Sequence, residues 1–408
     1  MASSAAGPLS GVKIVDLTTI VMGPFATQIL ASLGADVIKV ESPGGDDIRH
    51  VAPMNHHGMG HLFLHANQGK RSITLDLKSA QGQEVVARLC EWADVFISNI
   101  RPGALERLGL DYASVSKLNP CLIHVSCCGF SPNGPYAGKP AYDDLIQGAS
   151  GIPWLMDRYG AEEPCYVPVT LADRLTGLHA VYAVTAALYE RERSGEGQSV
   201  VVPMFEAMAQ FVLSDHLGGL TFQPANGEAG YARLLSSQRR PYPTKDGYLC
   251  VLIYNNKHWR TFIDAMGPVP GLADERFATQ ALRTMHIDLV YDQLAQLMLT
   301  RTTEQWRALL DALDIPNMPM NSPADLLHDP HLAAIDFVRD VQHPTEGAIK
   351  TPGNPTLWSR TRCEEPRPAP TLGEHTVEVL RELGYEEEAI SALLTDASEG
   401  LAHARGTD

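Results

Sequence analysis

The sequence predicts an α/β fold that combines a parallel sheet with a second, smaller unit. Through residues 1–200, short aliphatic and β-branched runs alternate with segments of helical periodicity. Such alternation is typical of βαβ units, whose strands lie parallel. Beyond residue 243 the helical patterns dominate, which indicates a second unit. The 408 residues are enough for both units.

The expected elements of the first half follow one another in the order of a βαβ chain. A turn at residues 194–197 ends a long helix, and a strand follows it. The expected strands span residues 12–17, 36–40, 72–77, 94–98, 121–126 and 198–204, and the expected helices span residues 25–33, 82–92 and 173–191.

The second half begins after a loop-like stretch, residues 224–243, which is rich in glycine, proline and polar residues. One strand and several helices follow, and proline-rich stretches then lead to the last two helices. The loop-like stretch is therefore a candidate boundary between two units. The expected strand spans residues 247–254, and the expected helices span residues 256–266, 283–300, 303–313, 374–383 and 386–394.

Composition excludes several classes of protein. The formal charge of −16 repels polyanions, so we expect no nucleic-acid partner. No apolar run reaches the roughly 18 residues of a membrane span, and no secretory signal is visible at the start, so we expect no membrane partner and a cytoplasmic location. The seven cysteines are odd in number and lack CxxC spacing, which predicts reduced, mostly buried thiols.

Motifs for common cofactors and metals are weak or missing. Neither GxGxxG nor GxxxxGK[ST] occurs in the sequence. His57, His61 and His65 recur at helical spacing beside His56, but glycines interrupt the segment and HExxH is absent. We therefore predict no metal site.

Asp173 stands between the extended stretch 167–171 and a helical segment, 175–189. From the residues alone, an N-cap role is the favoured interpretation, because aspartate there accepts hydrogen bonds from the first turn of a helix. The alternative role is that of a nucleophilic carboxylate.

A series of short motifs, in a consistent order from about Gly11 to Gly384, resembles family III CoA transferases, the group of carnitine dehydratase and bile-acid-inducible proteins (CaiB/BaiF). The motifs are Val15–Thr18, Gly23-Pro24, Leu33–Glu41, Pro43–Asp46, Asn67, Lys70–Ser72, Asp94-Val95, Asn99, Arg101–Gly103, Leu108-Gly109, Gly129-Phe130, Gly134–Tyr136, Pro140–Asp143, Leu171–Asp173, Gly195–Gln198 and Leu372–Thr376.

The resemblance implies a Rossmann-like large domain of residues 1–224 and 326–408, a small α+β domain of residues 225–325, and an interlocked homodimer. It also implies transfer of coenzyme A (CoA) from an acyl-CoA to a small carboxylic acid, with Asp173 forming first an anhydride and then a thioester. No permanently bound cofactor is expected, because CoA enters as a substrate. The implied CoA-binding residues are Ile20, Val21, Asn67, Lys70, Arg71, Asn99, Ile100, Arg101, Arg107, Lys139, Tyr142 and Asp143.

Two departures from the family pattern bear on specificity. Some relatives carry an arginine where this chain has Ser42, so one CoA contact is lost or replaced. The glycine-rich loop of oxalate-specific members has no counterpart, since Ser237–Pro243 occupies that neighbourhood, so oxalate is a doubtful substrate.

Two alternatives stay open beside the transferase. The same fold hosts α-methylacyl-CoA racemases, which use a histidine before the aspartate that matches Asp143. Tyr142 stands there, and its ordinary pKa is too high for that base. The second alternative is a non-catalytic acyl-CoA-binding protein, which the presence of Asp173 disfavours.

Overall fold

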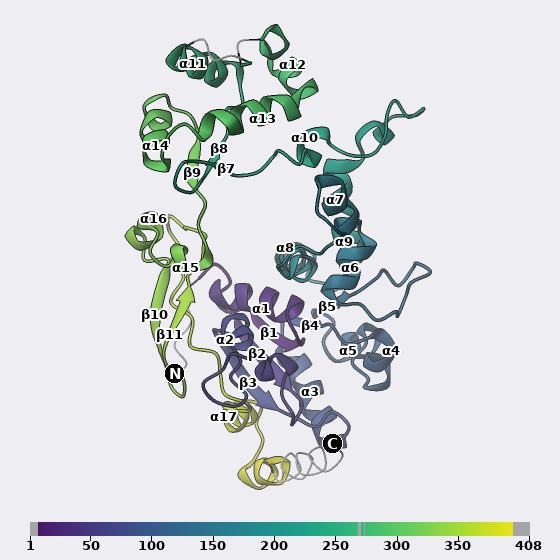
Figure 1. The fold of residues 1–408 in the computed structure, drawn as a ribbon. Helices are drawn as coiled ribbons and strands as arrows, with labels where there is room; N and C mark the ends of the chain where they lie inside the picture. Colours follow the sequence, from purple (N-terminus) through teal and green to yellow (C-terminus); the bar gives the residue numbers. More distant parts are fainter. Residues whose placement is uncertain (1–6, 268–270, 273, 395–408) are drawn as a thin grey trace. The chain divides into compact units, whose positions relative to one another are not determined.

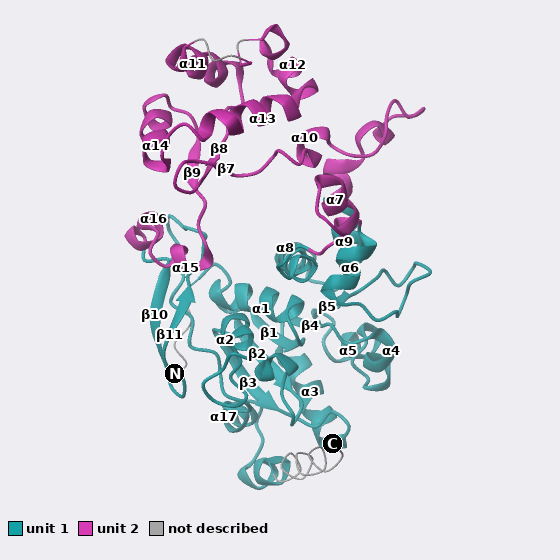
Figure 2. Ribbon diagram, viewed as in Figure 1, with its two compact units in different colours: residues 1–150, 167–211, 336–408 teal, residues 151–166, 212–335 magenta. Residues whose placement is uncertain are grey.

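The structure, a computed structural model, describes residues 7–267, 271–272 and 274–394 (Figure 1). The chain divides into two compact units (Figure 2). Unit 1 comprises residues 1–150, 167–211 and 336–408, and unit 2 comprises residues 151–166 and 212–335. The limits expected for the large and small domains stay a prediction.

A six-stranded sheet forms the centre of unit 1. All of its neighbouring strands pair in parallel, in the order β3-β2-β1-β4-β5-β6, which confirms the expected parallel sheet. The strand order reverses direction between β1 and β4, as in doubly wound nucleotide-binding folds. The strands are β1 Lys13–Leu17, β2 Asp36–Glu41, β3 Lys70–Thr74, β4 Val95–Ser98, β5 Ile123–Cys128 and β6 Ser199–Pro203.

The alternation of side chains along the strands divides the sheet into an apolar face and a partly charged face. Val15 and Leu17 of β1 belong to one buried core, together with Ile38 of β2. Asp16 lies on the opposite face, and its register partner is Lys39. On β1, therefore, only one face of the sheet carries a buried ionisable side chain, that of Asp16.

Helices cover both faces of the sheet. On the apolar face, α3 contributes Val85, Val86 and Leu89 to the core. On the other side, α1 packs closely along α8, because a Cβ at Gly177 would lie only 2.8 Å from the Met22 carbonyl oxygen. The helices within unit 1 are α1 Met22–Ser32, α2 His61–Ala66, α3 Ala80–Trp92, α4 Pro102–Arg107, α5 Tyr112–Leu118, α6 Asp143–Ala149, α8 Leu171–Ser194 and α17 Thr376–Glu382; residues 387–394 are also helical.

Unit 1 also contains an antiparallel hairpin, which the sequence did not predict. Its strands are β10 Val338–His343 and β11 Gly347–Pro352, joined by a turn at residues 344–346, and Gly347 begins β11 with a φ of 74°. A helical turn, η1 Asp47–His50, follows β2. The helix α9, Met204–His216, begins in unit 1 and ends in unit 2.

Unit 2 is mainly helical around a small antiparallel sheet of order β7-β8-β9. Its core gathers aromatic and aliphatic side chains, including Trp259, Phe262 and Trp306. The elements are α7 Ile152–Tyr159, η2 Gly218–Thr221, α10 Ala232–Leu235, β7 Tyr242–Pro243, β8 Tyr248–Val251, α11 Asn256–Met266, η3 Glu275–Phe277, α12 Gln280–Met285, α13 Ile287–Met298, α14 Thr303–Ala312, β9 Asn317–Pro319, α15 Pro323–Leu326 and α16 Pro330–Ala334.

The single helix expected over residues 283–300 is two helices, α12 and α13. The chain leaves the helical conformation at His286, whose φ and ψ are −116° and 32°. The buried guanidinium of Arg283 bonds to the Phe277 carbonyl oxygen and to Asn256 at 2.8 Å each. These bonds fix α12 against the preceding segments, and the chain turns after it.

Candidate active site

A pocket of about 780 Å³ opens in unit 1 beyond the carboxyl ends of β1, β4 and β5. Its walls include Thr19 and Ile20 after β1, Asn99 after β4, and Gly129 and Phe130 after β5. Since the strand order reverses between β1 and β4, the pocket lies where doubly wound sheets bind their ligands. Its volume is in the range of pockets for small molecules and cofactors.

Asp173 lies at the wall of this pocket. It belongs to the first turn of α8, but the N-cap of that helix is Thr170, and no side chain caps it. Among the residues that the structure describes, no hydrogen bond reaches the Asp173 carboxylate, although the side chain is only 8% exposed. The N-cap role that the residues alone favoured is therefore wrong, and the carboxylate is not engaged by its own helix.

Burial and, second, the negative charge of Asp143 raise the pKa of Asp173 from its ordinary 3.8 to about 7, while Arg174 opposes the shift. A carboxyl group in this range is partly protonated at neutral pH. Perturbed carboxyl groups in a pocket of this kind are typical of reacting groups.

Asp143 supports Asp173 from the first turn of α6. One Asp143 carboxylate oxygen accepts a 2.9 Å hydrogen bond from the backbone amide of Asp173. The other accepts a 2.6 Å bond from the side-chain amide nitrogen of Gln147. Gln147 also accepts a bond from the Val167 amide, so it fixes the segment that leads into α8. Asp143 is thus a buried neighbour that orients the chain around Asp173.

Basic side chains gather at the pocket. Arg101, Arg107 and Lys139 all line it and are exposed, so their charges face solvent at the opening. The Lys139 ammonium lies 4.3 Å from the centre of the Tyr136 ring. Such groups suit the phosphates of a nucleotide, Arg by paired hydrogen bonds and Lys as a point charge.

The structure brings eight of the residues named from the sequence to this pocket and leaves five outside its lining. Those at the pocket are Ile20, Asn99, Ile100, Arg101, Arg107, Lys139, Tyr142 and Asp173. Those outside the lining are Val21, Asn67, Lys70, Arg71 and Asp143.

The side chains of Lys70, Arg71 and Asn67 have partners within the fold. The Lys70 ammonium is buried and lies 3.0 Å from Asp16 and 2.7 Å from the Asn67 side-chain oxygen. Arg71 pairs with Asp36 at 2.7 Å and with two glutamates of α17. These contacts already pair the charges of Lys70 and Arg71 and engage the side chain of Asn67. The expected role of these three residues in CoA binding therefore has no support in this geometry.

Several pocket residues were not among those named from the sequence. Thr19, Cys127 and Phe130 belong to the ends of β1 and β5 or to the segments that follow them. Burial raises the pKa of the Cys127 thiol to about 12 and that of Cys128 to about 11, so both are neutral thiols at physiological pH. Position after a parallel strand is the sequence signal that points to such residues.

The cysteines are all unpaired, but only Cys90 and Cys127 are buried, so the expectation of mostly buried thiols is wrong. Cys250, for example, occupies an outward position of β8 and is exposed, because alternate side chains of a strand face opposite ways. Among the described residues, no three His, Cys, Asp or Glu side chains are grouped to hold a metal ion. His56 instead lies 3.1 Å from Glu346.

Comparison with known proteins identifies the family of this chain. The model of a family described as CoA-transferase family III matches residues 9–376. The chain belongs to CoA-transferase family III. The resemblance of its motifs to that family is thereby confirmed, and the protein is a CoA transferase.

Relatives of this CoA transferase have related names. Succinate–glutarate CoA-transferase of Agrobacterium fabrum is 35% identical over 92% of this chain and 96% of its own length. Succinyl-CoA:glutarate CoA-transferase of Mus musculus is 33% identical over 95% of this chain and 89% of its own. Formyl-CoA:oxalate CoA-transferase of Shigella sonnei is 31% identical over 95% of this chain and 98% of its own length.

A solved structure agrees with the family. The crystal structure of a CaiB/BaiF family protein from Brucella suis is 33% identical, has a TM-score of 0.79, and covers 93% of this chain and 100% of its own. Within the described residues of the transferase, no helix is both long and apolar enough to cross a membrane. The cytoplasmic location stays a prediction.

Proposed function

We propose that this CoA transferase moves CoA from an acyl-CoA thioester to a carboxylic acid, with Asp173 as the nucleophile. The observation that carries the proposal is the position of the Asp173 carboxylate. It lies at the wall of the pocket, buried, and no described residue donates a hydrogen bond to it. A carboxylate in that state is available to attack an electrophile that enters the pocket.

The first half of the reaction loads CoA onto the enzyme. A carboxylate oxygen of Asp173 attacks the thioester carbonyl, the carbon–sulfur bond breaks, and CoA thiolate leaves from a mixed anhydride. The thiolate then attacks the aspartyl carbonyl of that anhydride. The anhydride carbon–oxygen bond breaks, the donor acid leaves as a carboxylate, and Asp173 carries CoA as a thioester.

The second half repeats these steps with the acceptor. The acceptor carboxylate attacks the aspartyl thioester and releases CoA thiolate from a second anhydride. The thiolate attacks the acceptor's acyl carbonyl, which yields the new acyl-CoA and returns the Asp173 carboxylate. Burial of Asp173 protects these hydrolysis-prone intermediates from water, and the raised pKa makes the carboxylate a stronger nucleophile once it is ionised.

We propose that CoA is held by the basic and polar residues that line the pocket. Arg101, Arg107 and Lys139 supply positive charge for its phosphates. Ile20, Asn99, Ile100 and Tyr142 line the walls along which the rest of the cofactor lies. Asp143 acts behind Asp173 and is not proposed to contact CoA.

Succinyl-CoA as donor and glutarate as acceptor are the first substrates to test. The names of two relatives support this pair, since each mentions succinate or succinyl-CoA together with glutarate. Oxalate is a weaker candidate, because Ser237–Pro243 stands where oxalate-specific members carry a glycine-rich loop.

We also propose that the enzyme is an interlocked homodimer. The exposed side of α8 supports an interface, because Leu178, Tyr182 and Tyr189 are 50%, 58% and 68% exposed. Large apolar side chains grouped along one helix are typical of an interaction surface. A compact, active monomer in light scattering after dilution would contradict the dimer.

Trapping of the intermediate tests the proposed mechanism. Hydroxylamine added during turnover with an acyl-CoA should convert the activated Asp173 to a hydroxamate, which peptide mass spectrometry locates. Asp173→Ala should abolish both the product and the transfer of CoA. The matched control is Asp144→Ala, because Asp144 is an exposed carboxylate in the first turn of α6. A hydroxamate at another residue would contradict the proposal.

A further inference from the structure

The loop between β1 and α1, Thr18–Val21, is held by side chains from three other segments of unit 1. The Thr18 carbonyl oxygen accepts a 2.8 Å bond from the Lys39 ammonium. Asn99 accepts a 3.0 Å bond from the Thr19 amide and donates a 2.8 Å bond to the Thr19 carbonyl oxygen. The Ile20 amide donates a 3.0 Å bond to Asp46. Three successive residues, of which Thr19 and Ile20 line the pocket, are therefore fixed through their backbones.

The backbone conformation of Ile20 is unfavourable unless surrounding contacts impose it. Its φ is 71°, in the left-handed region that β-branched residues rarely adopt. In the described part of the chain, the other non-glycine residues with positive φ are both aspartates, Asp314 and Asp336. A β-branched residue keeps such a conformation only where surrounding contacts impose it, and such residues are frequent at ligand sites. Ile20 also lines the pocket.

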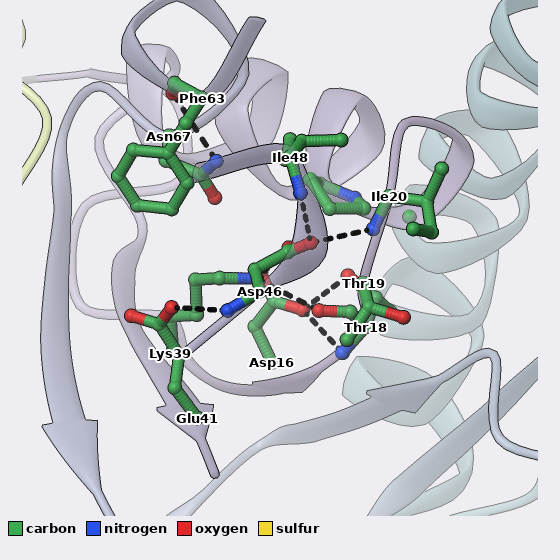
Figure 3. A network of polar contacts seen from close by, with 12 residues as sticks. Asp16, Thr18, Thr19, Ile20, Lys39, Glu41, Asp46, Ile48, Phe63 and Asn67 are labelled. Atoms are coloured by element: carbon green, nitrogen blue, oxygen red, sulfur yellow. Dashed lines mark hydrogen bonds and ion pairs between the residues drawn. The ribbon is translucent and has the colours of Figure 1, made fainter. Parts of the chain in front are cut away.

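Asp46 supplies that contact, and a buried ion pair holds it in place (Figure 3). One carboxylate oxygen accepts bonds from the Ile20 and Ile48 amides, at 3.0 and 3.3 Å. The other lies 2.9 Å from the Lys39 ammonium, and both side chains of this pair are fully buried. The Asp46 amide in turn donates to Glu41 at 3.1 Å. Both carboxylate oxygens and the backbone amide of Asp46 therefore have bonding partners.

The pair belongs to a buried network of balanced charge whose members come from β1, β2, β3 and the segment that follows β2. Its members are three acids and three bases: Asp16, Glu41, Asp46, Lys39, Arg49 and Lys70. None of the six lines the pocket. The network contacts the pocket lining through the loop Thr18–Val21, because Asp46 accepts the hydrogen bond of the Ile20 amide.

We propose that Asp46 and Lys39 are positioning residues for CoA binding, which keep Ile20 in its left-handed conformation and so shape the pocket wall that meets the cofactor. This inference rests on the proposed function, because it takes the pocket as the CoA site. The pair acts through the Ile20 amide and touches no substrate.

Two substitutions at Asp46 test this positioning role. Asp46→Ala removes both acceptor oxygens. Asp46→Asn keeps the shape but presents an amide nitrogen either to the Lys39 ammonium or to the Ile20 amide, so one donor faces another donor. Each variant should weaken CoA binding about tenfold, measured as Kd by titration calorimetry. Asp46→Ala loses the bond to the Ile20 amide, and Asp46→Asn loses either that bond or the Lys39 contact that holds residue 46 in place. Asp46→Asn also serves if Asp46→Ala does not fold.

A glycine at position 20 tests the route of the effect. Glycine adopts positive φ without steric cost, so Ile20→Gly added to either Asp46 variant should recover part of the lost affinity. Asp36→Ala is the matched control, because it breaks the Asp36–Arg71 ion pair at the start of β2 without touching the loop. It should lower thermal stability and leave the CoA Kd unchanged.

The outcomes distinguish this inference from the proposed function. If the unaltered protein does not bind CoA, the proposed function fails. If the unaltered protein binds CoA and the folded Asp46 variants bind it equally well, the positioning role is wrong. It is also wrong if Asp36→Ala weakens binding as much, or if Ile20→Gly restores nothing.

Discussion

The backbone amide of Asp173 donates a 2.9 Å hydrogen bond to the carboxylate of Asp143. This bond joins the first turns of α6 and α8 and places two buried carboxyl groups near each other. In this poorly solvated site the negative charge of Asp143 opposes ionisation of Asp173. The pair therefore sets both the position of the proposed nucleophile and its acidity.

Asp143→Asn should shift the pH dependence of the reaction. The negative charge of Asp143 is the second cause, after burial, of the raised pKa of Asp173. Asparagine keeps an oxygen for the Asp173 amide but removes the charge, so the pKa of Asp173 should fall. The acidic limb of kcat/KM against pH should then move to lower pH. Asp144→Asn, an exposed change in the same turn, should leave the limb in place.

Asp173→Asn should stabilise the protein in neutral and alkaline solution. The folded pKa of about 7 lies above the ordinary 3.8, so between these values the folded state binds more protons than the unfolded state. Stability therefore falls as pH rises through this window. The neutral variant escapes that loss, which amounts to about 4 kcal/mol at most. Thermal melts should show a higher Tm for the variant at about pH 8 and a small difference at about pH 4. A lower Tm at both would contradict the assigned acidity.

Arg107→Gln should weaken binding of the CoA thioester with little change in kcat. Loss of a bidentate phosphate contact should raise KM about tenfold or more, because hydrogen bonds between charged groups are the stronger ones. The same measurement with 3′-dephospho-CoA identifies the phosphate involved. If Arg107 binds the 3′-phosphate, the substitution should matter much less with the dephosphorylated substrate. An unchanged KM for both substrates would remove Arg107 from the site.

Lys70→Met should destabilise the fold and spare CoA binding. Burial by itself raises the pKa of Asp16, but the charges of Lys70 and Lys39, together with hydrogen bonds from two threonine hydroxyls, outweigh it and lower that pKa to about 2. Removing Lys70 leaves a buried carboxylate short of a partner, at a cost of about 3–5 kcal/mol. We expect a lower Tm and an unchanged KM in the protein that remains folded. A large rise in KM with an unchanged Tm would return Lys70 to the CoA site.

Acid should weaken the same ion pair. Because the folded pKa of Asp16 is depressed below the ordinary 3.8, its contribution is complete above that value and is lost as pH falls toward about 2. In Lys70→Met this acid dependence should be smaller. Unfolding curves between these pH values measure it directly.

The sheet could be predicted because strands buried on both faces read as nearly continuous apolar runs, as at Val95–Ser98, which is buried throughout. The helix α9 could not, because it starts at Met204 directly after the strand that ends at Pro203. Apolar residues continue across this junction, and hydrophobicity alone does not tell a strand from a buried helix.

The site was predictable at Asn99 and Arg101 through the resemblance to the family, and both line the pocket in the segment that follows β4. It was not predictable for Lys70, because a lysine looks the same in sequence whether it meets a phosphate or a buried carboxylate. Its partner Asp16 is 54 residues away along the chain. Only the folded structure shows that they meet.

Oxygen-isotope transfer tests the covalent role of Asp173 most directly. During multiple turnovers with an acceptor acid labelled with oxygen-18 in its carboxylate, each pass through the second anhydride should leave one acceptor oxygen on Asp173. Mass spectrometry of the peptide that contains Asp173 should then show oxygen-18 in that side chain. Continued CoA transfer with no label at Asp173 would contradict the mechanism.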